Sequence, residues 1–182
     1  SVLYAGIVVD TKNFAVQTGA RTFDAASFLR KAGADPNMVR QLFSQDFASV
    51  KLRASIVSSA EILPGGVIVA VCPPEVAATS VLVAQAADMM LNIEGIRVSI
   101  VIAQIGDEVV VSARSTGLVN VQVLMEELGG GGHQTVAGVQ LKGANLKELR
   151  RQIIELVNKY LEESDIYESD LVGRSEKNGE KR

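Results

Sequence analysis

Four consecutive glycines at 129–132 stand directly before His133, the only histidine of the chain. Because glycine has no Cβ, successive backbone N–H groups in such a run can converge on an anion or on the edge of a sugar. His133 would then offer a hydrogen-bond donor or acceptor at the lip of the site, and it could carry charge at moderately acid pH. A helix cap with a flexible linker and a purely structural histidine explain the same residues, so the pattern alone leaves both interpretations open.

Arg114 and Ser115 form a second polar group, at the end of a predicted strand. Alternation assigns two sets of residues to opposite faces of a sheet: Val109, Val111 and Ala113 on one, and Val110, Ser112 and Arg114 on the other. A guanidinium beside the N-terminus of the next helix is a reasonable phosphate clamp, although an arginine at a strand end is more often a solvated charge. That helix ends at the glycines, so both groups contact one ligand only if the ligand is long or the loop folds back.

The elements that would position these residues follow an α/β pattern. An apolar strand is predicted at 67–72, an alanine-rich helix at 75–93, a hairpin at 97–104 and 108–114, an amphipathic helix at 120–128, a strand at 135–141 and a helix at 145–161. The glycines would then be a short connection between a helix and a strand.

The region before residue 66 is predicted to be helical. Gly33 ends one helix, Asp35 with Pro36 begins the next, and a helix at 47–62 ends before Pro64. The chain opens on apolar residues without a cap, which indicates that it starts inside a larger protein. We therefore expect a helical piece at 1–46, a connecting helix and turn at 47–65, an α/β domain at 66–163 and a charged, disordered tail at 164–182.

Composition narrows the kinds of partner. Hydrophobic residues make up 47% of the 182 residues, which is enough for a core. The net charge of −3 and an aromatic content of 4% without tryptophan argue against a duplex-binding surface and a base-stacking platform, whereas a small anionic ligand stays compatible. The single cysteine, Cys72, follows an apolar strand and is predicted to be a packed thiol. The sequence shows neither a membrane-spanning window nor a signal peptide.

Two stretches resemble a known family. The stretch 112–138, SARSTGLVNVQVLMEELGGGGHQTVAG, resembles the glycine-rich motif of the DHH-associated domain, the substrate-binding lobe of the DHH phosphoesterases. The stretch 6–14, GIVVDTKNF, resembles the last motif of their catalytic lobe. The resemblance implies an α/β fold, a mixed sheet with flanking helices, preceded by a helical remnant of the DHH catalytic lobe.

Within that family the two stretches are most similar to the membrane-anchored bacterial cyclic di-AMP phosphodiesterases. The resemblance implies a pair of divalent ions, usually Mn²⁺, that activate water against a phosphodiester and yield pApA. Asp10 matches a metal-binding position, although alone it fits a helix terminus equally well. The positions that match phosphate, sugar and base contacts are Arg114, Ser115, Gly131, Gly132 and His133. Gly132→Val is accordingly expected to obstruct the ligand without unfolding the domain.

This sequence departs from the family pattern, because the paired aspartates and the Asp-His-His triplet are absent. We therefore expect this piece to be inactive alone and to need the catalytic lobe of the same polypeptide, as a cytoplasmic part of a membrane-anchored protein without membrane contact of its own. Pairing with a second copy stays open. Three alternatives remain: a phosphoesterase for short oligoribonucleotides or 3′-phosphoadenosine 5′-phosphate, a non-catalytic nucleic-acid-binding module, and an interaction domain without ligand.

Overall fold

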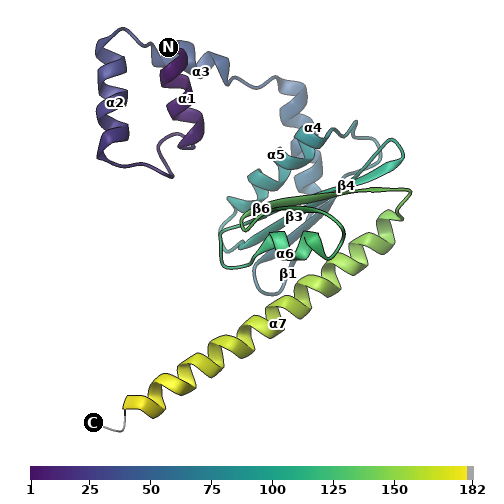
Figure 1. Cartoon of the computed structure of the whole chain (residues 1–182). Helices are drawn as coiled ribbons and strands as arrows, with labels where there is room; N and C mark the ends of the chain where they lie inside the picture. Colours follow the sequence, from purple (N-terminus) through teal and green to yellow (C-terminus); the bar gives the residue numbers. More distant parts are fainter. Residues whose placement is uncertain (180–182) are drawn as a thin grey trace. The chain divides into compact units, whose positions relative to one another are not determined.

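A computed structural model describes residues 1–179, with side chains described up to Glu163 (Figure 1). The chain divides into two compact units, Ser1–Asp46 and the part from Phe47 onward. The charged tail predicted at 164–182 lies outside the residues whose side chains are described. Its disorder therefore stays a prediction.

The first unit consists of three helices: α1 (Val2–Asp10), α2 (Ala20–Lys31) and α3 (Pro36–Leu42). The predicted break between the last two is confirmed. Gly33 adopts φ +92° after α2, and the Asp35 side chain caps α3 by accepting a hydrogen bond from the backbone N–H of Asn37 at 2.9 Å. Pro36 occupies the first helical turn, where its missing N–H costs no hydrogen bond.

The second unit contains a mixed sheet, as the resemblance predicted. The sheet has six strands in the order β1-β2-β3-β4-β6-β5. The pair β2–β3 is parallel and all other neighbours are antiparallel. The strands are β1 (Glu61–Leu63), β2 (Val67–Val71), β3 (Val98–Ile105), β4 (Glu108–Ser115), β5 (Gly131–His133) and β6 (Val136–Lys142). The hairpin β3–β4 turns at Gly106 and Asp107, as expected from the sequence.

Helices cover both faces of this sheet (Figure 1). On one side lie α4 (Phe47–Ser58) and α5 (Ser80–Leu91), and on the other α6 (Val121–Glu126) and α7 (Leu146–Gly179). We call these sides the α5 face and the α7 face. Each has its own buried apolar cluster, so the domain is built as two hydrophobic layers around one sheet. The amphipathic stripe predicted from Val121 to Leu128 packs on the α7 face.

The helices predicted at 47–62 and at 75–93 differ in extent from those in the structure. The helix expected at 47–62 ends at Ser58, and Glu61–Leu63 instead forms β1, paired with β2. Gly65 and Gly66, both with positive φ, make the tight turn that brings these strands together. The alanine-rich helix expected from residue 75 begins at Ser80, because the Thr79 hydroxyl caps it by accepting a hydrogen bond from the N–H of Leu82.

In the part of the chain that the structure describes, none of the helices is both long and apolar enough to cross a bilayer.

Candidate ligand-binding site

The second half of the glycine run, Gly131 and Gly132, belongs to a β-strand, which corrects the expectation that the run is only a short connection. Residues 131–133 form the edge strand β5 and pair with β6 in the register Gly131↔Gly138, Gly132↔Ala137 and His133↔Val136. Gln134 and Thr135 lie between the two strands and form the turn. The run therefore builds a hairpin at the edge of the sheet instead of a linker.

Three of the four glycines are required by this fold. Gly129 adopts φ +84° after α6, a conformation that favours glycine. A Cβ on Gly130 would lie 2.6 Å from the Cβ of Val139. Gly132 has φ +149°, and its Cβ would lie 2.5 Å from the Cα of Ala137. The expectation that Gly132→Val leaves the fold intact is therefore wrong, because the side chain would collide with the backbone of β6.

Gly131 differs from its neighbours. Its φ lies outside the positive range of Gly129 and Gly132. A Cβ built on it meets no heavy atom of the described chain within 4 Å. Since Gly131 pairs with Gly138, which pairs with Ser112, it belongs to the same sheet row as Ser112. The fold gives no reason for a glycine here, which leaves close approach by a ligand as an explanation.

The chain folds back so that the hairpin tip meets the start of α6. The carbonyl oxygen of Gln134 accepts a hydrogen bond from the N–H of Val121 at 3.0 Å. The carbonyl oxygen of Thr135 accepts one from the N–H of Ser115, also at 3.0 Å. The Gln134 side-chain amide donates to the Gly117 carbonyl at 3.1 Å. These hydrogen bonds bring the end of β4 and His133 to the same region. The loop therefore folds back, which is the condition under which Arg114 and the glycine run can contact one ligand.

Strand register places Arg114 and His133 on one face. Arg114 pairs with Val136, and Val136 pairs with His133, so the three form one row across β4, β6 and β5. Ser99 continues that row on β3, and its hydroxyl donates to the Ala87 carbonyl of α5 at 2.7 Å, which identifies the α5 face. Two strand spacings separate Arg114 from His133, about 10 Å.

Ser115 does not join this row. It pairs with Val98, whose side chain is buried on the α7 face, and it is itself buried. Its hydroxyl accepts a hydrogen bond from the N–H of Gly117 at 2.9 Å. Gly132 likewise pairs with Ala137 on the α7 face. Of the five predicted contact residues, the structure thus gathers Arg114, Gly131 and His133 on the α5 face.

Arg114 is not a solvated charge, because its side chain is only 10% exposed. Its Nε donates to Asp88 Oδ1 at 2.8 Å, and its Nη1 donates to Ser112 Oγ at 2.8 Å and to the Ala113 carbonyl at 3.0 Å. Nη2 takes part in none of the interactions of the described residues. It is not a buried orphan either, since each buried side-chain nitrogen in that part of the chain has a partner. The guanidinium is therefore fixed, with one nitrogen available.

Asp88 is the site residue that the sequence analysis missed. It lies 26 positions before Arg114, on α5, and it pairs with that arginine through the fold alone. A single signal existed in the sequence, since Asp88 is the one charge in the otherwise uncharged helix SVLVAQAADMML.

A groove of about 410 Å³ lies beside this row. α5 packs against β3 and β4, whereas β6 and β5 lie beyond them in the sheet. The groove is lined by Ser80, Val110, Val111, Ser112, Gly130, Ala137, Gly138, Val139 and Gln140. Small residues and hydroxyls dominate this lining, and none of its residues is charged. It can therefore hold an uncharged group such as a sugar or a base next to the cationic Arg114.

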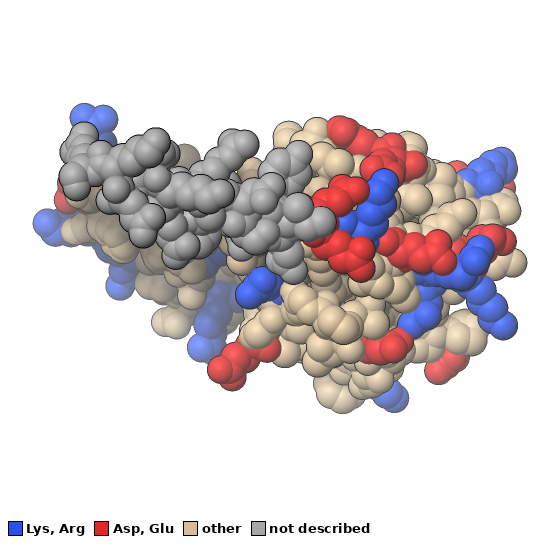
Figure 2. All heavy atoms as spheres, turned by 90° about the horizontal axis from the view of Figure 1, so that it is seen from below, with Lys and Arg blue, Asp and Glu red and all other residues tan. Residues whose placement is uncertain are grey.

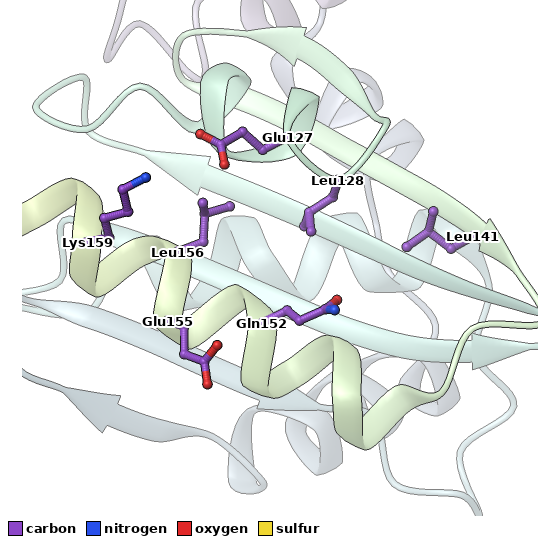
Figure 3. A pocket seen from close by; sticks show the side chains of 7 residues that line it. All are labelled: Glu127, Leu128, Leu141, Gln152, Glu155, Leu156 and Lys159. Carbon is purple, nitrogen blue, oxygen red and sulfur yellow. The ribbon is translucent and has the colours of Figure 1, made fainter.

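A second groove, of about 520 Å³, lies on the α7 face (Figure 3). It is lined by Glu127, Leu128, Leu141, Gln152, Glu155, Leu156 and Lys159. Leucines form its apolar part, and two carboxylates with one lysine surround them. The described lining includes none of the residues that the sequence analysis selected. Acidic and basic side chains are interspersed over the surface seen in Figure 2, which offers no broad basic face there for a nucleic acid.

Asp10 belongs to the first unit, where it is the exposed last residue of α1. The loop that follows holds Lys12, Asn13 and Phe14 at positive φ, a conformation that side chains rarely adopt and that costs energy at each residue. Among the described residues there is no group of three or more His, Cys, Asp or Glu side chains that could hold a metal ion. Asp10 can therefore supply one ligand of a metal site, not a whole site.

Cys72 is a buried free thiol, as the sequence predicted. Burial raises its pKa above the ordinary value, and the nearby Glu75 carboxylate raises the pKa further. Both effects disfavour the thiolate, which is the nucleophilic form. The cysteine accordingly belongs to the packing of the α5 face.

A mixed sheet between two helical layers, with a glycine-rich edge strand that ends at His133, defines the class of this domain. The DHHA1 domain model matches residues 65–163, and the chain belongs to that family. The cyclic-di-AMP phosphodiesterase PdeA of Listeria monocytogenes is 45% identical over 161 residues, which are 88% of this chain and 24% of that protein. The cyclic-di-AMP phosphodiesterase GdpP of Geobacillus thermodenitrificans is 45% identical over 163 residues, 89% of this chain and 25% of that protein.

The resemblance inferred from the two sequence stretches is thereby confirmed, and the chain spans about a quarter of the length of these curated relatives. The fold class is also confirmed. An exopolyphosphatase-related protein from Bacteroides fragilis superimposes with a TM-score of 0.78 at 17% identity, covering 87% of this chain and 49% of that one. At this identity the likeness concerns the fold alone.

Proposed function

We propose that this chain is the substrate-binding part of a phosphodiesterase that hydrolyses cyclic di-AMP to pApA. The names of the relatives support the activity, and one observation in this chain supports the binding role. Arg114 is held rigidly with Nη2 available, in the same sheet row as His133. A buried, pre-oriented guanidinium is suited to a phosphate, because its planar donors match the phosphate oxygens and little side-chain entropy is lost on binding.

The roles of the predicted residues divide by face. Arg114 binds a phosphate, His133 donates to or accepts from a second polar group of the ligand, and Gly131 allows the ligand to approach the edge strand. The neighbouring groove takes a sugar or base. Ser115 and Gly132 shape the site from the α7 face, the former by holding the loop at Gly117 and the latter by close pairing of β5 with β6.

The hydrolytic step requires residues beyond these. Phosphoesterases of the DHH family are generally dependent on divalent metal ions, and we propose Mn²⁺ for this protein, with Asp10 as one ligand. When bound, such ions activate water as a nucleophile. The described residues do not fit a complete metal site, so the other ligands would come from the rest of the whole protein.

The catalytic lobe of the same polypeptide is the partner that we propose for the first unit. Several large apolar side chains of this unit are exposed, among them Leu3, Phe28 and Leu42, each at 65% or more. Surfaces of this kind usually belong to an interface. The whole protein would then be anchored in the bacterial membrane with this part in the cytoplasm, as the resemblance implies.

Calorimetric titration of the chain with pApA, cyclic di-AMP and a longer oligoadenylate tests the binding role. We expect saturable binding of the dinucleotides, which Arg114→Ala weakens about 100-fold. Binding of the longer strand alone would favour a nucleic-acid-binding module, and no binding of any of the three would contradict the proposal. In the whole protein, Asp10→Ala should abolish manganese-dependent hydrolysis; a wild-type rate would remove Asp10 from the metal site.

A further inference from the structure

The Arg114 side chain is attached to helix α5 through Asp88. The Asp88 carboxylate accepts a hydrogen bond from Nε at 2.8 Å. Nη1 donates to two acceptors of β4, the Ser112 hydroxyl and the Ala113 carbonyl. Two different nitrogens are thus held from two different elements, α5 and β4. Holding Nε and Nη1 together fixes the plane of the guanidinium and leaves Nη2 as its available nitrogen.

The helix that carries Asp88 is itself fixed to the sheet at this point. The carbonyl of Ala87, the preceding residue, accepts a hydrogen bond from the buried Ser99 hydroxyl of β3 at 2.7 Å. Ser99 and Arg114 are directly paired across β3 and β4. The hydrogen bond from Ser99 therefore fixes α5 on the sheet next to Arg114, and Asp88 of α5 in turn fixes the guanidinium.

A contribution to stability does not explain this ion pair well. The Asp88 side chain is 49% exposed, and ion pairs that reach solvent contribute about 0–1 kcal/mol to folding. The ion pair matters more for the orientation of Arg114 than for folding. Without Asp88 the Nε–H loses its acceptor, and the long side chain gains rotational freedom.

We propose that Asp88 is a positioning residue, which holds the Arg114 guanidinium so that Nη2 faces a phosphate of the ligand. The inference rests on the proposed function, since it requires that Arg114 binds phosphate. The opposite role for Asp88, competition with the ligand for Arg114, makes a different prediction. If Asp88 competed with the ligand for Arg114, its removal would strengthen binding, whereas positioning requires that removal weakens it.

The experiment is calorimetric titration with pApA of the wild-type chain and of Asp88→Ala and Asp88→Asn. Asp88→Asn keeps an oxygen acceptor for Nε and should retain binding within about threefold, whereas Asp88→Ala should bind about tenfold more weakly, the effect of one charge-assisted hydrogen bond. The melting temperature of each variant is measured alongside. A purely structural role predicts that binding follows the melting temperature and that Asp88→Asn gives no rescue.

A matched control and a double variant complete the test. Asp107 forms an exposed ion pair with Lys142 at 3.2 Å, in the turn at the far end of β4, and Asp107→Ala should leave the pApA affinity unchanged. In an Arg114→Ala background, Asp88→Ala should have no further effect, because it acts only through that arginine.

The outcomes separate the two proposals. If Arg114→Ala weakens binding and Asp88→Ala does not, or if Asp88→Ala strengthens it, the positioning role is overturned and the binding site stands. If the wild type binds no pApA, or if Arg114→Ala binds normally, the proposed site fails and the role of Asp88 fails with it.

Discussion

The α7 face and the α5 face of the sheet differ in the residues that they bury. On the α7 face, the buried residues of β3 and β4 are apolar up to Ala113, and α6 and α7 cover them. On the α5 face, the same two strands carry buried polar residues, and α5 packs mainly against these two strands. Ser99, Ser112 and Arg114 are buried there and hydrogen-bonded. One face stabilises the domain, and the other holds polar groups in fixed positions.

The glycine run shows the same division residue by residue. Gly130 and Gly132 are needed because a Cβ would collide with the backbone or side chains of β6. Gly131, between them, meets no such obstacle and lies in the sheet row of Ser112. Variants of adjacent glycines should therefore separate folding from binding, which a composition argument about four glycines cannot do.

Gly132→Val should have the largest effect, on folding. The new side chain meets both a left-handed backbone and the Cα of Ala137, so we expect a loss of about 3 kcal/mol or more in the free energy of unfolding. Urea denaturation followed by circular dichroism measures it. A stability equal to that of the wild type would mean that Gly132 of β5 does not pair with Ala137 of β6.

Arg114→Ala should weaken the binding of pApA about 100-fold, since it removes a charge-assisted contact to phosphate. The loss in folding stability should be smaller, because the half-exposed Asp88 carboxylate is hydrated by water when the arginine is removed. Calorimetry gives the affinity. The control is Arg151→Ala on α7, which removes an exposed arginine that pairs with Glu148, and which should bind pApA normally.

His133→Ala should weaken the same binding about fivefold, the contribution of one hydrogen bond that is partly replaced by water. His133→Gln retains a donor and an acceptor and should recover part of the affinity. Equal affinity of the wild type and both variants would assign the histidine to the hairpin and not to the ligand.

Gly131→Ala should have the smallest effect. In contrast to Gly132→Val, it should change ligand binding and leave the stability of the fold nearly unchanged. The free energy of unfolding should stay within about 0.5 kcal/mol, since the Cβ has room and alanine restricts the unfolded chain. Binding of pApA should weaken about threefold, because the methyl group stands where the ligand approaches the strand. An unchanged affinity would place the ligand away from the edge strand.

Local signals in the sequence predicted much of the fold. The alternation in β4 assigned Arg114 and Ala113 to opposite faces, and the Asp35 cap gave the start of α3. Both depend on neighbouring residues. The strand β5 could not be predicted in this way, because glycine has low strand propensity and β5 exists only through its pairing with β6.

The candidate site required contacts between distant residues. The hydrogen bond from Val121 to Gln134 folds the hairpin back, and the ion pair from Arg114 to Asp88 spans 26 positions. Neither leaves a periodic pattern in the chain. The residue types Arg, Gly and His could be selected from their chemistry, whereas their division between the two faces follows from the register of the completed sheet.

The most direct test of the account is to map the ligand onto the two faces. Backbone amide NMR shifts of the isotope-labelled chain would be followed during titration with pApA. We expect the largest saturable shifts at Arg114, Gly131 and His133, together with Ser112 and Gly138 of the groove on the α5 face. Largest shifts at Leu128, Leu141 and Leu156, in the groove of Figure 3, would contradict the assignment of binding to the α5 face.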